Sequence, residues 1–417
     1  MRFTFVFVVL ILSQAFIYFQ FLSYIKTLKW YKKSYAYYTL IPFVLFNVPF
    51  IILSTVSHGN INPPGWFKST FFVPFYIWEC ASIMILPWLL VGKIIKAPFL
   101  LFIWISKLFK PVKIKIEALK NKRAVKTVDL SRRKFVRYST FAVASYAFLG
   151  SGYGVVKHNA YQIDYEKIKI SNLPEEFKGM TITLLSDIHA GQFMDENDMK
   201  EYCEVVNGLG SDVVCIPGDF VNFDRTDSHM VARAFKDMKA KYGIYGSLGN
   251  HDFFQDADYV AEVMVNESPV KMLRNNYQKI TINQKDLFIL GVDDIAASGV
   301  NMNRVIEYLD SLIIYLNENE KSFATSPKIL LCHKPYAFDT LAAKNLDLVF
   351  AGHTHGGQVV PVKLGDFDLS FAAFVSKYIA GLYNIGKSNM YVSRGIGTVI
   401  LPIRLNCSPE VTKITLI

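Results

Sequence analysis

The chain has 417 residues, enough for two or three domains, and its hydrophobic fraction of 52% exceeds that of ordinary soluble proteins. Its net charge of +10 is divided unevenly: residues 1–160 carry 21 Lys and Arg against 3 Asp and Glu, whereas residues 161–417 carry 24 against 32. Because the basic residues flank apolar segments and the second part is acidic, we expect a lipid bilayer as partner and no nucleic acid. The five cysteines have no paired spacing that would indicate a disulfide framework or a zinc knuckle.

Apolar segments fill residues 1–160, which we interpret as a membrane domain. Residues 3–25, 35–56 and 70–91 are each about as long as the ~20 residues that cross a bilayer as a helix. The first segment is longer than the roughly 7 to 15 apolar residues of a signal peptide, and further spans follow it, which favours an uncleaved helix. Residues 99–109 are apolar but short, and we interpret them as an interfacial piece.

A fourth span is predicted at residues 138–156, where small residues lower the hydrophobicity. The preceding residues 131–137, SRRKFVR, resemble the twin-arginine export signature, and a merely basic cytoplasmic flank is an equally good interpretation. The first connecting loop carries four lysines, the second only Lys68, and residues 93–137 carry fourteen Lys or Arg. The positive-inside rule then predicts about four helices with a basic cytoplasmic loop, and it places residues 157–417 on the outer side of a bacterial cytoplasmic membrane.

The pattern of residues 161–417 is that of a separate α/β domain. Strands are predicted at 180–186, 212–216, 243–248, 279–283, 287–292, 328–332, 346–350, 358–362, 389–393 and 411–416. Helices are predicted at 195–207, 228–239, 257–266 and 305–317. The early strands alternate with helices, as parallel sheets require, while the late strands follow one another closely, as in antiparallel pairing. We therefore expect two mixed β-sheets packed face to face, flanked by helices.

Polar side chains follow the ends of these strands, where the loops of such folds form sites. The candidates are Asp187, His189, Asp219, Asn250, His333, His353 and His355. They are oxygen and imidazole donors without a thiolate, which suits Mn, Fe, Zn or Ni. Seven ligands are too many for one ion, so we predict two divalent ions bridged by a carboxylate. Two ions ~3.5 to 4 Å apart can hold a bridging hydroxide as nucleophile and stabilise both the attacking and leaving oxygens at phosphorus.

The stretch AGHTHGGQ at residues 351–358 carries two of these histidines. If the chain is extended there, His353 and His355 lie on one side of it, and the glycine pair lets the backbone approach a ligand. Each polar group taken alone is a plausible turn or cap, but five in order are not. Residues 196–198 are expected to be a solvated helix start, and Asp293 and Asp294 are expected to cap the next turn rather than to bind metal.

Over residues 178–417 the ordered groups D-x-H, G-D, G-N-H-D, H and G-H-x-H resemble the calcineurin-like metallophosphoesterases. The resemblance implies that Asp187, His189 and His355 hold one ion, that Asn250, His333 and His353 hold the other, and that Asp219 bridges them. It also implies two catalytic residues, with His251 binding the phosphoryl oxygen or protonating the leaving group and Asp252 orienting it. Asn222 stands where the family's second motif usually has Asp or Arg, which argues against a phosphoprotein phosphatase.

Within that family, the GGQ and the closing SRG to PIR stretch are similar to a membrane-associated bacterial subfamily. Its relatives include twin-arginine-exported enzymes and enzymes similar to UDP-diacylglucosamine pyrophosphatases. This implies a membrane-anchored hydrolase of phosphodiester or pyrophosphate bonds, acting on a lipid-linked or envelope substrate. A catalytically inactive, metal-holding interaction domain is the alternative, and the presence of His251 and Asp252 disfavours it.

Overall fold

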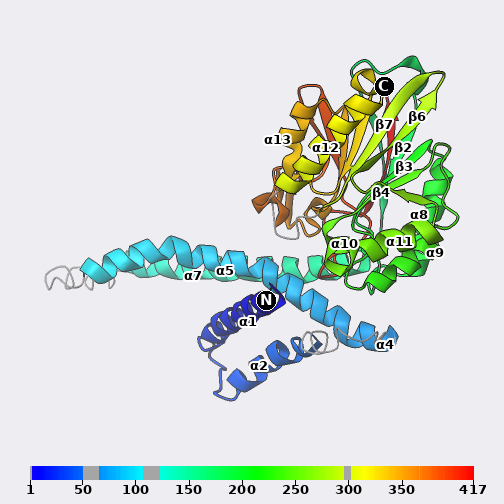
Figure 1. The fold of residues 1–417 in the computed structure, drawn as a ribbon. Coiled ribbons are helices and arrows are strands. Elements are labelled where there is room, and N and C mark those ends of the chain that lie inside the picture. The colour runs from blue at the N-terminus through cyan, green and yellow to red at the C-terminus, as the bar shows by residue number, and fades with distance from the viewer. Residues whose placement is uncertain (1, 50–64, 107–122, 295–301, 366) are drawn as a thin grey trace. The chain divides into compact units, whose positions relative to one another are not determined.

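The computed structural model describes residues 2–49, 65–106, 123–294, 302–365 and 367–417, and these form two compact units, Met1–Val155 and Val156–Ile417. Figure 1 shows an N-terminal set of helices and a C-terminal α/β unit. The helices of the first unit are α1 (Arg2–Ile25), α2 (Tyr35–Leu45), α4 (Gly65–Phe67), the π-helical η1 (Lys68–Phe72), α5 (Val73–Ser106) and α7 (Arg123–Val156).

Two helical stretches of the described chain, Val8–Ile25 and Ser69–Ser106, are long and apolar enough to cross a membrane. The predicted span at 70–91 and the predicted interfacial piece at 99–109 are joined in one helix, because α5 continues through both until Ser106. Residues 107–109 lie outside the described residues. The predicted span at 35–56 is described only to residue 49, and its helix α2 ends at Leu45. The segment 138–156 forms the end of α7. Within the described residues, α7 is not among the helices that are apolar enough to cross a membrane.

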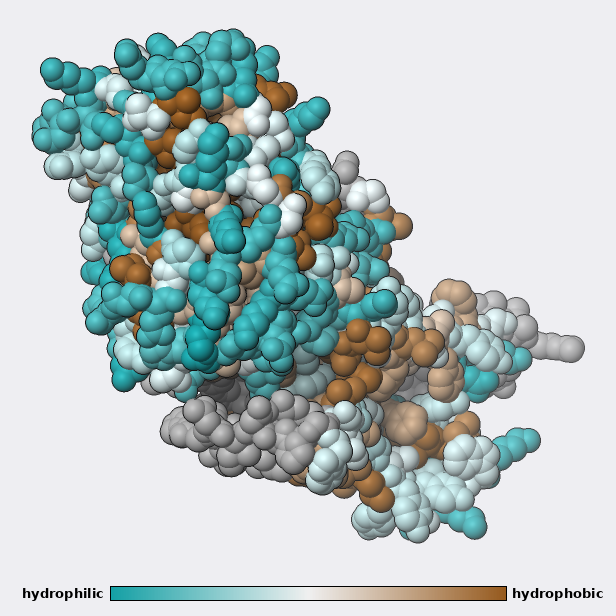
Figure 2. Space-filling model, turned by 90° about the vertical axis from the view of Figure 1, so that its right-hand side faces the viewer, coloured by the Kyte–Doolittle hydropathy of each residue, from teal (hydrophilic) through white to brown (hydrophobic). Residues whose placement is uncertain are grey.

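A buried polar contact joins two of these helices. The Gln14 side chain of α1 donates from Nε2 to both carboxylate oxygens of Glu79 in α5, at 3.1 and 3.2 Å, and its Oε1 accepts from Trp78 Nε1 at 2.9 Å. Polar groups inside an apolar bundle need such partners. In the face drawn in Figure 2, broad hydrophobic areas mark the helical unit, whereas hydrophilic residues cover most of the α/β unit.

The α/β unit contains two six-stranded sheets, and the predicted fold class is confirmed. The first sheet has the order β1 (Gln162–Ile168), β14 (Glu410–Leu416), β2 (Thr181–Leu184), β3 (Val213–Pro217), β4 (Ile244–Ser247) and β5 (Val270–Met272). The second has the order β12 (Gly381–Ile385), β13 (Ser388–Val392), β9 (Leu348–Ala351), β8 (Lys328–Cys332), β7 (Lys285–Val292) and β6 (Asn276–Ile282). A small hairpin joins β10 (Val362–Leu364) to β11 (Phe367–Leu369).

Helices cover the outer faces of both sheets (Figure 1). Those packed on the first sheet are α8 (Glu196–Leu209), α9 (Ser228–Phe235) and α11 (Ala257–Glu267), and those on the second are α12 (Asn303–Asn319) and α13 (Phe338–Leu341). The helix α10 (Asn250–Gln255) begins at the site. The short 3₁₀ segments are η2 (Glu175–Phe177), η3 (Arg225–Asp227), η4 (Phe323–Thr325), η5 (Pro335–Ala337), η6 (Ala342–Lys344), η7 (His355–Gly357) and η8 (Ala372–Phe374).

The core has three apolar layers because the central strands are buried on both faces. In β3, Val213 and Cys215 pack between the two sheets, while Val214 and Ile216 pack under the helices. Such strands have continuous apolar sequences, which is why they could be found without an alternating pattern. The capping box at Asp195 starts α8 as expected, since its carboxylate accepts from the backbone N–H groups of Asn197 and Asp198.

Two predictions about the late strands are wrong. Residues 358–362 form no ladder of a main sheet, because Val359 makes only an isolated bridge with Leu405 and Val362 begins the small hairpin. Antiparallel pairing does not dominate either: β7, β8, β9 and β13 are all parallel. Parallel strands need long crossover connections. The connection through α12 joins β7 to β8, and the chain that includes the β10–β11 hairpin leads from β9 to β13.

Candidate metal centre

The candidate ligands lie at the carboxyl ends of strands from both sheets. Asp187 and His189 follow β2, Asp219 follows β3, and Asn250 follows β4. His333 follows β8, and His353 and His355 follow β9. Because β2, β3 and β4 run parallel in one sheet and β8 and β9 run parallel in the other, their loops meet at one edge of the two-sheet core.

Left-handed backbone positions these residues. The φ angles of Asp187, His189, Asp219, His353 and His355 lie between 49° and 72°. Such values are uncommon outside glycine, and their clustering at one place is typical of a functional site. The expectation that His353 and His355 lie on an extended segment is therefore wrong: His355 begins the 3₁₀ turn η7, and local turns rather than strand alternation aim both rings.

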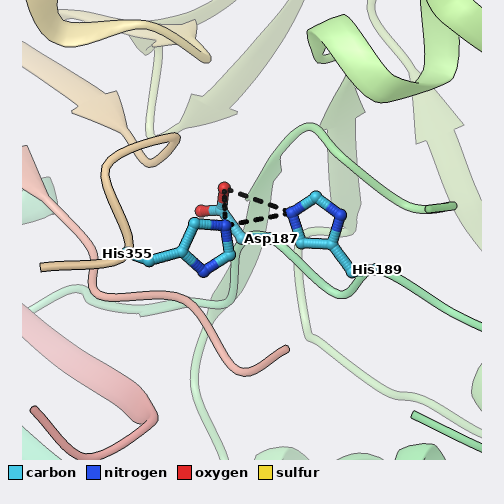
Figure 3. A group of neighbouring side chains, drawn as sticks. All are labelled: Asp187, His189 and His355. Carbon is cyan, nitrogen blue, oxygen red and sulfur yellow. Dashed lines mark hydrogen bonds and ion pairs between the residues drawn. The ribbon is translucent and has the colours of Figure 1, made fainter. Parts of the chain in front are cut away.

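One group of ligand atoms consists of Asp187, His189 and His355, of which the first two come from the loop after β2 and the third from the loop after β9 (Figure 3). The Nε2 atoms of His189 and His355 lie 3.1 Å apart, and Asp187 Oδ1 lies 3.9 and 3.5 Å from them. The same Oδ1 accepts from the backbone N–H of His353 at 2.8 Å, while Oδ2 accepts from Ser186 Oγ at 2.7 Å. Asp187 thus ties the loop of the last two histidines to the end of β2.

A second group consists of Asp219, His333 and His353. His333 Nε2 lies 3.0 Å from Asp219 Oδ2, and its Nδ1 is 2.8 Å from the carbonyl oxygen of Pro217. A carbonyl can only accept, so His333 Nδ1 carries the proton and Nε2 is directed toward the centre. Asn250, which is buried, has a side-chain oxygen without a hydrogen-bond partner among the described residues, which fits an amide ligand to a cation.

Asp219 links the two groups, because it belongs to the second and also forms a third candidate group with His189 and His251. Its Oδ2 lies 3.5 Å from His189 Nε2 and 3.0 Å from His333 Nε2, while its Oδ1 accepts from the backbone N–H of His251 at 2.8 Å. Close packing fixes the carboxylate: a Cβ at Gly249 would stand 2.2 Å from Asp219 Oδ1. Gly352 has the same relation to Asp187, whose Oδ2 would lie 2.1 Å from the added carbon. Both loops therefore require glycine beside the carboxylate.

Burial and the neighbouring carboxylates shift the pKa values of the candidate ligands in different directions. Burial lowers the pKa of His189, His353 and His355 well below the usual value, which keeps these imidazoles neutral and able to bind metal. Burial also lowers the pKa of His333, but the adjacent Asp219 outweighs it and raises that pKa to about 10. Burial raises the pKa of Asp187 to about 6, and Asp219, despite its burial, has a pKa held well below the usual range by His333.

His251 lies beside both groups and remains partly exposed. Its ring contacts the ring of His189 edge to face, with the centroids 4.6 Å apart. Its Nδ1 lies 3.0 Å from the carbonyl oxygen of Asn222, so Nδ1 donates and Nε2 is left for a ligand. Among the described residues, Asp252, which the resemblance expects to orient this ring, forms no hydrogen bond to it.

The buried Asp252 carboxylate instead holds the backbone of two loops. Oδ1 accepts from the N–H groups of Phe220 and Val221, and Oδ2 accepts from those of Asp219 and Gly249. Its pKa is raised to about 7 by burial and by the charge of Asp219. Asn222 accepts from His251 through its main-chain carbonyl oxygen. A pattern of side chains in the sequence does not reveal such a main-chain acceptor.

Arg404 was not among the expected site residues, although it ends the closing PIR stretch. It is buried, and its guanidinium donates to the carbonyl oxygens of His355, Gly395 and Gly397. Its Nη2 also lies 3.4 Å from His355 Nδ1. The signal available in the sequence was the PIR stretch itself, whose arginine was not considered for the site.

Asp293 and Asp294 form ion pairs, and the turn that they were expected to cap lies outside the described residues. Arg274 Nε lies 3.0 Å from Asp293, and Lys334 Nζ lies 2.9 Å from Asp294. Both carboxylates are buried, which makes a charged partner necessary. They end β7 close to the site, but neither belongs to a group that could hold a metal ion among the described residues.

Known proteins are similar to this chain in the same region. The model of the calcineurin-like phosphoesterase family matches residues 180–357. A transmembrane protein with a metallophosphoesterase domain from Danio rerio is 29% identical over 63% of this chain and 59% of its own length. An uncharacterized metallophosphoesterase of Campylobacter jejuni, Cj0846, is 26% identical over 89% of this chain and 87% of its own. The phosphodiesterase YaeI of Escherichia coli is 24% identical over 69% of this chain and all of its own length.

Proposed function

We propose that this chain, whose residues 180–357 match the model of the calcineurin-like phosphoesterases, is a membrane-anchored hydrolase of phosphodiester or pyrophosphate bonds. The observation that carries the proposal is the position of Asp219 Oδ2, within 3.5 Å of an imidazole nitrogen from each of the two ligand groups. A carboxylate shared in this way suits two cations that lie close together.

The residues divide into two sets. Asp187, His189 and His355 would hold one divalent ion, and Asn250, His333 and His353 the other, with Asp219 shared. Bound ions would activate a water molecule as nucleophile and neutralise charge on the phosphoryl oxygens. Their identity would be Mn, Fe, Zn or Ni, since the donors are imidazoles and oxygens.

His251 supplies a group that the ions do not. Its Nδ1 donates to the carbonyl oxygen of Asn222, so its Nε2, when protonated, can donate a hydrogen bond to a phosphoryl oxygen or give a proton to the leaving oxygen. A metal-holding interaction domain would have no need of an aimed, partly exposed imidazole beside its ions. This observation favours an enzyme over the inactive alternative.

We expect the full chain, purified in detergent with Mn²⁺, to hydrolyse bis(4-nitrophenyl) phosphate, with release of 4-nitrophenolate as the readout. Chelation should abolish the activity, and re-addition of Mn²⁺ should restore it, because no residue of the site can replace the charge of the ions. A chain that binds metal and gives no turnover would favour the interaction domain. The phosphodiesterase name of the Escherichia coli relative supports the choice of a diester.

The substrate proposed is a phosphodiester or pyrophosphate of a lipid or envelope component. The apolar helices of this chain and the transmembrane relative from Danio rerio support a membrane location. Lysine and arginine counts favour an outer location for residues 157–417, because the basic loop precedes them.

We expect a reporter enzyme fused after Ile417 to be active when it is of the kind that works only outside the cytoplasm. The same fusion with a reporter that works only inside should be silent, since the positive-inside rule keeps the basic loop of residues 93–137 in the cytoplasm. The reverse result would replace the envelope substrate by a lipid precursor made in the cytoplasm.

A further inference from the structure

Exposed apolar side chains gather on the loops that follow the last metal-site histidines. They are Val362, Leu364 and Leu369 of the β10–β11 hairpin, Phe371, Phe374 and Val375 around η8, and Ile400, and together they are called the apolar rim. Leu364 is 70%, Phe374 80% and Ile400 68% exposed. Single exposed apolar residues are ordinary, but seven on connected loops beside one site are not.

The rim is fastened to the metal-site loop. The segment η8 contacts η7, which contains His355. A Cβ at Gly357 would lie 2.5 Å from the Ser370 side chain, so the two loops touch through bare backbone. Thr354 Oγ1 also donates to the carbonyl oxygen of Ile379 at 2.5 Å. A surface bound by the rim would therefore lie next to the site.

Ile400 is held outward against its own preference. Its φ is +67°, in the left-handed region, which a β-branched residue rarely adopts. The Gln358 side chain fixes the loop: Nε2 donates to the carbonyl oxygens of Val399 and Leu401, and Oε1 accepts from the Val399 N–H. Three hydrogen bonds thus hold the backbone of Ile400 in a strained conformation, although its apolar side chain is exposed. Backbone strain of this kind is typical of residues with a functional role.

The chain enters the α/β unit at the same edge. Gln162 begins β1, and its N–H donates to the carbonyl oxygen of Pro409 at 2.8 Å. A polar cavity of about 450 Å³ is lined by Gln162, Lys363, Arg394, Asn406, Cys407 and Ser408. Thus the entry point and the β10–β11 hairpin border one cavity, and Cys407 in its wall donates from Sγ to the carbonyl oxygen of His355 at 3.2 Å.

The connection to the helical unit is short. Helix α7 ends at Val156, six residues before Gln162, and six residues span at most about 20 Å when extended. The backbone turns at Lys157 and Ala160 shorten that reach further. The chain that joins the helical unit to the start of β1 is therefore a short tether.

We propose that the apolar rim inserts into the interfacial layer of a lipid bilayer and so presents the metal site to phosphoesters in that layer. The inference rests on the proposed function for the identity of the reaction, and on the loops above for the surface. Residues 362–375 contain one Lys and two Asp, so attraction to anionic lipid contributes little. Insertion of Phe, Leu and Ile should therefore occur in bilayers of neutral phosphatidylcholine.

The test uses the full chain in phosphatidylcholine nanodiscs, with a nitroxide label on Phe374→Cys. The five native cysteines are buried, so the unsubstituted chain gives the background of labelling. The matched control is Ile314→Cys on α12, which is also exposed and apolar but lies outside the rim. Power-saturation measurements compare collisions of each label with oxygen, which concentrates in lipid, and with a water-soluble nickel chelate.

We expect the ratio of oxygen to nickel collisions to be severalfold higher at residue 374 than at residue 314. Equal, water-like ratios at both positions would overturn the proposal. A high ratio at 374 accompanied by dipolar coupling between two labels would also overturn it, because a second copy of the chain would then cover the rim. The depth measurement needs no turnover, so assay of the same labelled sample with bis(4-nitrophenyl) phosphate separates failure of the docking surface from failure of the proposed reaction.

Discussion

Asp219→Asn is expected to lose both bound metal and activity. The amide oxygen can still accept from the His251 N–H, so the fold should survive, but the amide nitrogen would replace the charged oxygen that lies between His189 and His333. Removing an outer partner of a metal ligand commonly lowers metal affinity by about 10- to 100-fold. We expect a larger loss here, because the carboxylate would serve two ions directly.

Elemental analysis and the rate with bis(4-nitrophenyl) phosphate are the two readouts for this variant, and circular dichroism checks the fold. Asp237→Asn is the matched control, since it removes the same charge from an exposed position just after α9. It should keep full metal content and rate. An Asp219→Asn protein that retained two ions per chain would show that Asp219 is not shared between them.

His251→Ala is expected to behave differently, with metal retained and the rate reduced by roughly 10² to 10⁴, the usual contribution of a positioned acid or base. His251 touches Asp219 through its main-chain N–H, which alanine keeps. Its Nδ1 contacts the carbonyl oxygen of Asn222, so in the proposed role its loss removes a group for the substrate rather than a support for the ions.

The control for this variant is His229→Ala. His229 is also partly exposed, and its ring binds Glu267 and Tyr259 away from the metal groups, so its removal should leave metal and rate unchanged. If His251→Ala lost metal as Asp219→Asn does, His251 would be a ligand. The group of His189, Asp219 and His251, whose ligand atoms lie close together, makes that outcome a real alternative.

The buried strands and most of the site residues could be placed from sequence for a simple reason. Strands such as β3 and β8 are apolar on both faces, so they appear as short unbroken runs, and a polar residue just after such a run must lie at a sheet edge. Strand β1, QIDYEKI, was not predicted because its exposed and charged positions dilute the signal.

Backbone conformation accounts for what sequence did not provide. The left-handed turns at His353 and His355 could not be inferred from an HTHGG pattern that also fits extended chain. The acceptor of His251 is the main-chain oxygen of Asn222, and main-chain groups leave no mark on residue type. The family resemblance assigned Asp252 to the neighbouring imidazole, whereas its four backbone bonds join loops that lie about thirty residues apart in the chain.

The two-metal assignment is tested most directly by running the activity measurement as a metal titration of the full chain. Metal-free protein would receive Mn²⁺ in steps, with bound metal per chain and hydrolysis of bis(4-nitrophenyl) phosphate followed on the same samples. The two ligand groups that share Asp219 predict that binding ends at two ions and that the rate rises as the second site fills. Saturation at a single ion with full activity, or two bound ions with no turnover, would contradict it.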